Sequence, residues 1–340
     1  MYFSDPASSS PQPDVPVTLA PPVLPPQLRT VVSGDADEHA QNLGAWDQSY
    51  EQLGRGRFIG RLDELWLDAL QLFRERTSHE VLETGVPWPG SRTFGIPLAM
   101  EGTAIYGGRP MPSDMILTLG PQDALEFRTP SSLDIVGLSL AADALSAFSR
   151  ELEGIDIEDE LRGRWLLPVA PPTLASLRGF FGRVFELLET SAEQLENPQV
   201  ARGLQHALLE RVIGAVRDAR AEPPQTFTHS VRRGIVQRAR DYALSRTDEP
   251  VTVLELCSAL KISRRTLQTC FHAMLGMSPH QYLRTLRLNG LRRDLRHACA
   301  ATTSVQALAA RWGFWHLSSC AADYRRLFGE LPSATLRVPR

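Results

Sequence analysis

The sequence predicts an α+β chain in two parts: an N-terminal antiparallel β-barrel (cupin-like) with helices, and a C-terminal all-α domain in which a long helix joins two helix-turn-helix units. Short apolar runs between Gly, Pro and Asp over residues 46–140 are typical of an antiparallel barrel or sandwich. From Ala141 onward, apolar residues recur at helical spacing. Charge divides as well: residues 229–340 hold 18 basic and 7 acidic side chains, and residues 1–228 hold 18 and 32. A basic C-terminal third is typical of a nucleic-acid-binding module joined to another kind of domain.

Four parts follow from this composition. Residues 1–40 are predicted to be a disordered Pro-rich arm, because eight prolines precede Gln27 and few large apolar side chains accompany them. Residues 41–220 form the predicted barrel domain with its helical end, for which effector binding and dimerisation are the expected roles. The segment AEPPQTFT, residues 221–228, breaks the helical pattern and is the predicted linker. Residues 229–340 form the predicted DNA-binding domain.

A barrel of this size can enclose one small ligand. Aromatic side chains and a lone acid are common in such pockets, so the candidate ligand-binding residues are Trp88, Phe94, Glu101 and Tyr106. The alternative is that Phe94 and Tyr106 belong to the core and that Glu101 lies in a turn.

Metal-dependent catalysis is not expected. A cupin-type metal site needs several histidines and a carboxylate, but His79 is the single histidine between residues 46 and 140. The GxSxG motif of serine hydrolases is also absent. We therefore predict no metal site and no enzyme, with a non-metal barrel enzyme and an effector-independent DNA-binding protein as the alternatives.

The cysteines and the apolar segments indicate the compartment. The four cysteines form no CxxC pair, and three of them occupy apolar positions of helical patterns, so we expect buried reduced thiols. The sequence has neither a signal-peptide pattern at its start nor an apolar stretch of about 18 residues. We expect a cytoplasmic protein without a membrane partner.

Three helices are predicted between the barrel and the linker, over residues 141–152, 173–191 and 198–220. The last two carry strong apolar stripes that must be buried. Packing on the barrel and a homodimer interface both satisfy this requirement, and the sequence leaves the two open.

The stretch VTVLELCSALKISRRTLQTCF, residues 251–271, predicts a helix-turn-helix. Thr252 can cap a short helix, Lys261-Ile262 forms a turn, and Ser263 caps a second helix. The second helix would bury Leu267 and Phe271 and would turn its Arg, Gln and Thr side chains outward. An ordinary helical hairpin with a solvated face is the alternative for this stretch alone.

A second helix pair makes the helix-turn-helix interpretation far more specific. Ser278-Pro279 starts a long helix, whose exposed arginines, among them Arg292, Arg293 and Arg296, we expect on a solvated face. Thr303 or Ser304 then caps VQALAARWGF, and Ser318 caps SCAADYRRLF.

The motifs SRRTLQTCFHAMLGMSPHQYLRTLRL, ALAARWGF and LFGELPSATLR resemble the DNA-binding domain of the AraC/XylS family of bacterial transcription regulators. The resemblance covers residues 229–337. It implies base-facing side chains in the first unit, phosphate contacts beside them, and a second base-facing set. These are, in order, Arg265, Gln268 and Thr269; Ser263, Arg264 and Thr266; and Ser318, Ser319 and Ala322.

The second set departs from the family pattern. Ala322 cannot donate a hydrogen bond, Asp323 adds negative charge near DNA, and Cys320 stands where an aromatic residue is usual. We infer that the second unit positions the protein more than it reads sequence. The family implies an effector-controlled regulator, in our interpretation an activator, with promoter DNA, RNA polymerase and a second copy of the chain as partners.

More narrowly, RWGFWHLSSCAADYRRLFGELPS, TFGIPL and GGRPMPSD are similar to the subgroup that regulates ethanolamine-utilisation operons. That resemblance implies an amine or amino-alcohol effector and cobalamin as a cofactor. The sequence holds no DxHxxG motif, and no residue is assigned to cobalamin.

Overall fold

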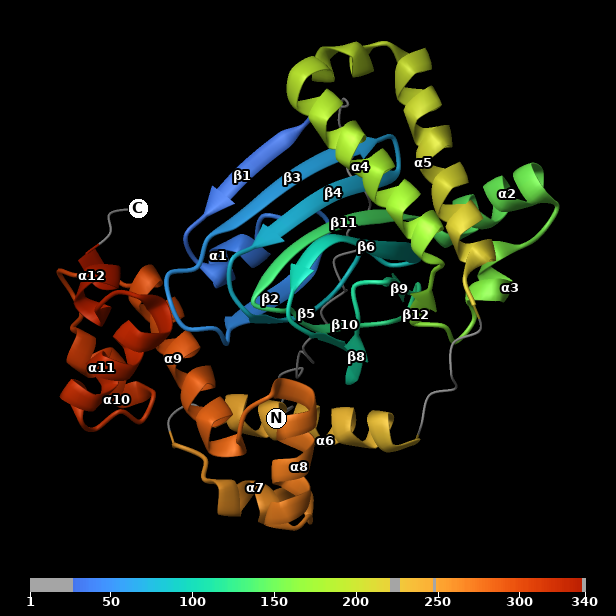
Figure 1. Cartoon of the computed structure of the whole chain (residues 1–340). Helices are drawn as coiled ribbons and strands as arrows, with labels where there is room; N and C mark the ends of the chain where they lie inside the picture. The colour runs from blue at the N-terminus through green and yellow to red at the C-terminus, as the bar shows by residue number, and fades with distance from the viewer. Residues whose placement is uncertain (1–26, 221–226, 247–248, 338–340) are drawn as a thin grey trace, which may run out of the picture.

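The computed structural model describes residues 27–220, 227–246 and 249–337, in which strands build the N-terminal part and helices build the C-terminal part (Figure 1). The described strands form two separate antiparallel sheets. The prediction of a closed barrel is therefore wrong, because no edge strand of one sheet pairs with an edge strand of the other within these residues. The sandwich that the same strand pattern allowed is the observed arrangement.

The larger sheet has seven strands. Its period of two places Leu70 and Leu72 on the face that the helices cover and Phe73 and Glu75 on the face toward the second sheet. In spatial order its strands are β1 (Arg29–Ser33), β3 (Gly60–Leu67), β4 (Leu70–Thr77), β11 (Ser132–Ala141), β6 (Ser91–Glu101), β9 (Met115–Leu119) and β12 (Leu166–Pro168).

The smaller sheet has five strands and separates the larger sheet from the C-terminal helices. Tyr50 of β2 pairs in register with Glu83 of β5, and both side chains point toward the larger sheet. The next register pair, Glu51 and Leu82, points the other way and contacts residues of the C-terminal helices. In spatial order its strands are β2 (Asp47–Gln52), β5 (Val81–Val86), β10 (Leu125–Arg128), β7 (Ala104–Tyr106) and β8 (Arg109–Met111).

Two long helices, α4 (Pro171–Ser191) and α5 (Pro198–Asp218), lie across the outer face of the larger sheet (Figure 1). The apolar stripe predicted for residues 173–191 is the buried face of α4, so packing on the sheet accounts for it. Its buried residues are Leu174, Leu177, Phe181, Val184, Phe185 and Leu188. Leu187 and Val200 remain exposed at the end of the helix pair. The shorter elements beside them are α2 (Ala142–Glu153), α3 (Ile157–Leu161) and the 3-10 turn Ala192–Glu196.

The predicted disordered arm is wrong at its C-terminal end. β1 pairs with β3, and the short helix α1 (Ala36–Ala40) follows, with Asp35 accepting a hydrogen bond from the Glu38 N–H at its N-terminus. Residues 1–26 of the arm lie outside the described residues. So do residues 221–226 of the predicted linker, after which α6 begins at Phe227.

The C-terminal helices begin largely where the capping residues predicted. Thr252 and Ser278 each form a reciprocal capping box, and Ser263 and Ser304 each accept a hydrogen bond from the first turn. The predicted cap Ser318 is wrong, because its helix already begins at Leu317. The helices are α6 (Phe227–Leu244), α7 (Val253–Leu260), α8 (Arg264–Leu275), α9 (Pro279–His297), α10 (Val305–Arg311), α11 (Leu317–Phe328) and α12 (Pro332–Arg337).

The two parts of the chain share a buried interface. Leu53 and Leu82 of the N-terminal part pack into the apolar core of the first helix-turn-helix unit. The carboxylate of Glu51 accepts hydrogen bonds from Arg240 Nε and from the Tyr282 hydroxyl, both at 2.9 Å. The interface therefore buries a charge together with apolar surface, which fixes the relative position of the two parts.

The arginines of α9 that the sequence placed on a solvated face instead face α1. Arg292 is buried and pairs with Asp35, and its Nη1 lies 2.8 Å from Glu330 Oε1. Arg293 and Arg296 lie beside it and pair with Asp37 and Glu38. The expectation was wrong because helical periodicity shows that a face is polar but not that an acidic helix covers it.

Asp35 is the buried anion of this contact. Burial raises its pKa, but Arg292, the Glu38 N–H and Arg296 outweigh burial and hold the pKa below its ordinary value. A carboxyl whose pKa is lower in the folded than in the unfolded state contributes stability at neutral pH and loses it as pH falls through the folded pKa.

Replacing Arg292 with Met should lower the free energy of unfolding by about 3–5 kcal/mol, because it leaves Asp35 buried without its cation. The matched control is Arg293→Met, which removes a half-exposed pair and should cost about 0–1 kcal/mol. Chemical denaturation of the full chain measures both values. Equal effects of the two substitutions would contradict a buried ion pair at Arg292.

Candidate nucleic-acid interface

The first helix-turn-helix unit presents one polar face to solvent. Lys261 adopts a left-handed conformation (φ 54°) between α7 and α8 and so allows the tight turn. Leu267, Cys270 and Phe271 form the buried face of α8. The six predicted contact residues are all exposed on the opposite side, namely Ser263, Arg264, Arg265, Thr266, Gln268 and Thr269.

The second unit repeats this arrangement in α10 and α11. Its turn passes through Gly313, where φ is +70° and an added Cβ would lie 2.1 Å from Pro250 Cγ, so no other residue fits without a shift. The predicted contact residues Ser318, Ser319 and Ala322 are exposed on α11. Both predicted contact sets therefore lie on solvent-exposed faces.

The negative charge of Asp323 is neutralised within the protein. Its carboxylate pairs with Arg284 of α9, and its Oδ1 lies 3.2 Å from Arg326 Nη1. Arg284 also donates to the Ser319 hydroxyl at 3.1 Å, and it lies over the ring of Phe314. The second unit is thus less repulsive to phosphate than its sequence suggested, but Ser319 is partly engaged.

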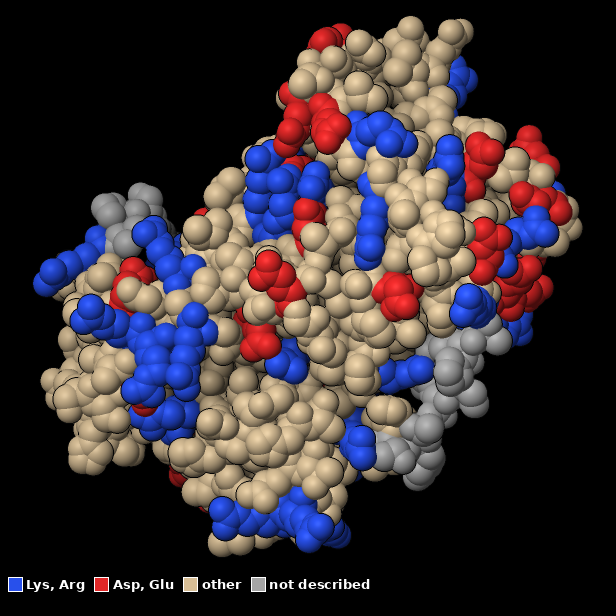
Figure 2. Space-filling model, in the orientation of Figure 1, with Lys and Arg blue, Asp and Glu red and all other residues tan. Residues whose placement is uncertain are grey.

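Basic side chains gather on the visible face of these helices. Figure 2 shows one group over α7 and α8 at the lower edge and another over the region of α9 to α11. Two separated basic surfaces on one side of the molecule suit contact with a phosphate backbone at two places.

One exposed aromatic residue beside the second unit was missed in the sequence. Trp315 precedes α11 and is 71% exposed, although large aromatic side chains usually lie buried. Its indole offers an N–H donor and an apolar face next to the predicted contacts. The run WGFWH contains two tryptophans, and the sequence alone does not show which one is exposed. In the structure Trp312 is buried against Gly290, whereas Trp315 is exposed.

The cysteines are free in the described structure. Cys270 and Cys320 are buried, Cys257 is partly buried and Cys299 is exposed. Burial raises the pKa of Cys320 to about 11, so that thiol is protonated at neutral pH. Within residues 27–220, 227–246 and 249–337, no group of three His, Cys, Asp or Glu side chains is placed to hold a metal ion. None of the described helices is both long enough and apolar enough to cross a membrane.

The four predicted ligand-binding residues are not brought together. Phe94 belongs to the core that faces α4 and α5, and Tyr106 packs behind Phe127 with its hydroxyl bonded to the Thr118 carbonyl. Trp88 is buried in the loop before β6, and Glu101 is exposed at the end of β6. Phe94 and Tyr106 thus follow the core alternative that the sequence left open.

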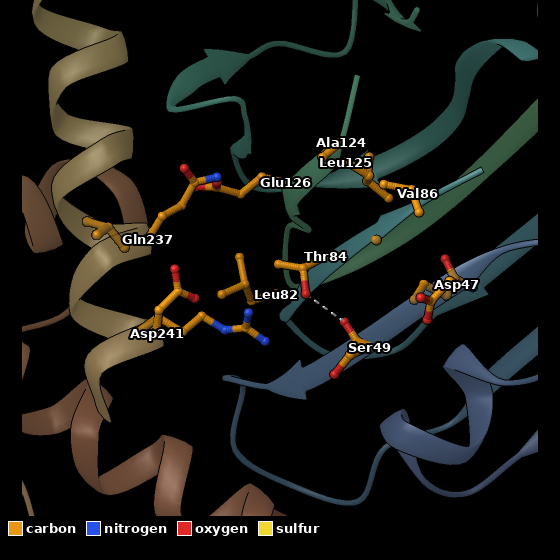
Figure 3. A pocket seen from close by; sticks show the side chains of 14 residues that line it. Asp47, Ser49, Leu82, Thr84, Val86, Ala124, Leu125, Glu126, Gln237 and Asp241 are labelled. Carbon is orange, nitrogen blue, oxygen red and sulfur yellow. Dashed lines mark hydrogen bonds between the residues drawn. The ribbon is translucent and has the colours of Figure 1, made fainter. Parts of the chain in front are cut away.

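Two hollows flank the smaller sheet instead. A cleft of about 390 Å³ lies between this sheet and α6, and Figure 3 shows Gln237 reaching across it toward Glu126 while Thr84 donates to the Ser49 carbonyl on the sheet. Glu126 is also bonded by Arg233, at 3.1 Å. A smaller cavity lies on the other side of the sheet, between the two sheets.

Comparisons with known proteins find a matching family model and several relatives. A family model described as a helix-turn-helix domain matches residues 256–337. The probable thc operon regulatory protein of Rhodococcus erythropolis is 30% identical over 198 residues, and the match spans 54% of this chain and 58% of that protein. The XylDLEGF operon transcriptional activator 2 of Pseudomonas putida is 31% identical over 121 residues, which cover 34% of this chain and 77% of that protein.

A crystal structure of a probable AraC family transcriptional regulator from Rhodopseudomonas palustris CGA009 is 33% identical. The match covers 31% of this chain and 95% of that chain, with a TM-score of 0.29.

Replacing Arg265 with Ala should weaken binding of the full chain to its preferred DNA sequence by about 1–3 kcal/mol and relax the preference at one base pair. The matched control is Arg264→Ala on the same helix. It should weaken binding to all sequences alike and reduce the slope of log affinity against log salt by about one. Titrations with cognate and scrambled duplexes at several salt concentrations measure both effects. An unchanged sequence preference after Arg265→Ala would remove this residue from the base-contacting set.

Proposed function

The chain belongs to the AraC/XylS family of transcription regulators, and on that premise we propose that it binds a specific promoter sequence under the control of a small-molecule effector held by the N-terminal part. The observation that carries this proposal is the arrangement of the two helix-turn-helix units. Their predicted contact faces are exposed while the other side of the same domain is docked on the smaller sheet.

The long helix α9 sets the distance between the two units. Its 19 residues span about 28 Å, close to one turn of B-DNA at about 34 Å. Tyr282 and Leu286 of α9 lie in the core of the first unit, and Leu291 and Leu295 lie in the core of the second. A helix packed into both cores keeps the units at a fixed spacing, which suits two successive major-groove contacts from one protomer.

We expect the two units to contribute differently. Arg265 and Gln268 carry the donors and acceptors that suit guanine and adenine edges, whereas Ala322 carries none. The first unit then supplies most of the sequence preference, and the second supplies position and phosphate contacts.

Strand β2 connects the inner cavity directly to the DNA-binding domain, which offers a means of control by an effector. The Tyr50 hydroxyl donates to Glu75 inside the N-terminal cavity, at 3.0 Å. The next residue, Glu51, holds Arg240 and Tyr282, and Gln52 exchanges backbone hydrogen bonds of 2.9 and 3.0 Å with the Asn289 amide. A ligand that moves Tyr50 would also move the strand on which the DNA-binding domain is docked.

The same proposal includes activation of transcription, a homodimer and a class of effector. The XylDLEGF relatives are transcriptional activators, which supports activation by this chain, and contact with RNA polymerase is the proposed means. A homodimer is part of the proposal, and the end of the α4 and α5 pair, where Leu187 and Val200 are exposed, is its proposed contact. An amine or amino alcohol is the proposed effector class. Cobalamin does not fit the inner cavity, which holds about 40 Å³, and no cobalamin site is proposed.

The spacing of the two units gives a direct test. The full chain should select a two-box DNA site with box centres about one helical turn apart. Inserting about five base pairs, half a turn, between the boxes should abolish specific binding because it moves the second box to the opposite face of the duplex. Inserting about ten base pairs restores the face but not the distance, so it is the matched control and should also fail. Retained affinity after either insertion would contradict a rigid two-box reader.

A further inference from the structure

A cavity of about 40 Å³ lies between the inner faces of the two sheets. A single water needs about 10–15 Å³ on this scale, so the cavity has room for a group of a few heavy atoms. Four of the rings that line it are those of Trp46, Tyr50, Phe73 and Phe127.

Two acidic side chains line this mostly apolar space, Glu75 from β4 and Glu83 from β5, and Gln48 and Thr93 are its other polar side chains besides the Tyr50 hydroxyl. They come from different sheets and therefore face the cavity from opposite walls. None of the described lining residues is basic. The cavity therefore places two acidic groups within low-dielectric walls.

Glu83 lacks the partners that a buried carboxylate normally has. The residue is 4% exposed, and its Oε1 is fully buried without a hydrogen-bond donor. Its cross-strand neighbours are Tyr50 and Phe127, and the Tyr50 hydroxyl donates to Glu75 instead. An unpaired buried carboxylate costs stability, so this oxygen is an open position for a donor that the protein itself does not supply.

We propose that this cavity binds a small organic cation, a protonated primary amine on a short carbon chain, with its ammonium group between Glu83 and Glu75 and its carbon atoms against the surrounding rings. An ammonium group provides up to three donors and a positive charge. One of these donors would satisfy the Oε1 of Glu83, whereas Glu75 already accepts from the Tyr50 hydroxyl and would add a second acidic group beside the cation. Aromatic faces stabilise the same charge. The inference rests on the proposed function only in taking this bound amine as the effector.

The direction in which the pKa of Glu83 is shifted agrees with the lack of a cation beside it. Burial, followed by the charge of Glu75, raises the pKa of Glu83 well above its ordinary value. The other titratable groups around the pair are Tyr50 and His39, whose Nε2 lies 3.0 Å from Glu75 Oε1. A cation would favour the ionised form of Glu83, so the affinity for a protonated amine should rise as pH rises and Glu83 ionises.

The cleft between the sheet and α6 is a weaker candidate. It is larger, but its buried acid Glu126 is already bonded by Arg233 and Gln237. The inner cavity is the hollow in which a buried acidic oxygen is left without a donor.

The test uses the full chain and two amines, ethanolamine and propylamine, each paired with its neutral isostere, ethylene glycol and propanol. Titration calorimetry and thermal unfolding report binding without DNA. The amines should bind and raise the unfolding midpoint, and the neutral compounds should not. Glu83→Gln should weaken amine binding about tenfold or more while the ligand-free midpoint stays unchanged or rises. The matched control is Glu101→Gln, an exposed acid outside the cavity, which should bind amines as the native chain does.

Three results would overturn the cation site: no response to either amine, equal binding of the neutral isosteres, or native affinity in Glu83→Gln. The proposed function fails on a different measurement, sequence-specific binding of a two-box duplex. A chain that binds that duplex but no amine keeps the regulator and loses the cation site. A chain that binds amines but no specific DNA keeps the cation site and loses the regulator.

Discussion

The carboxylate of Glu51 holds the two parts of this chain together. It lies on β2, is almost fully buried, and accepts hydrogen bonds from Arg240 of α6 and Tyr282 of α9. Burial of Tyr282, followed by the charge of Glu51, raises the pKa of its phenol well above the ordinary value, so the hydroxyl keeps the proton that it donates to Glu51. Because α6 begins the C-terminal domain and α9 joins its two units, one carboxylate fixes both relative to the smaller sheet.

Most of the helical domain could be predicted because its signals are local. Thr252, Ser263 and Ser278 cap the helices that begin after them, and the apolar stripe of α4 is its buried face. Long-range pairings could not be predicted. Sheet closure depends on edge strands far apart in sequence, and Asp35, the partner of Arg292, lies 257 residues away at the N-terminus of α1. A basic helical face has the same sequence pattern whether solvent or an acidic helix covers it.

The two candidate sites also differ in how well the sequence predicts them. The predicted DNA-contact residues are exposed because they alternate with the buried positions of one helix, and that alternation is visible in the sequence. The predicted ligand residues were chosen by residue type, which does not report the face of a strand. The alternation of side chains along each strand would have predicted the cavity-lining residues better. Glu75 shares its face with Phe73, and Glu83 shares its face with Val81, so each acid lies at an inward position of a buried strand.

The smaller sheet therefore has acidic side chains on both faces, and those on one face have basic partners whereas an oxygen on the other face has no donor. On the face toward the helices, the acids Glu51 and Glu126 have arginine partners supplied by α6. On the inner face, Glu83 has no donor for Oε1. An effector changes DNA binding only through a difference in its affinity for two arrangements of the protein. Tyr50 and Glu51 are consecutive residues with side chains on these two faces, so any displacement of β2 that follows neutralisation of the inner acids is passed directly to the contact that holds α6 and α9.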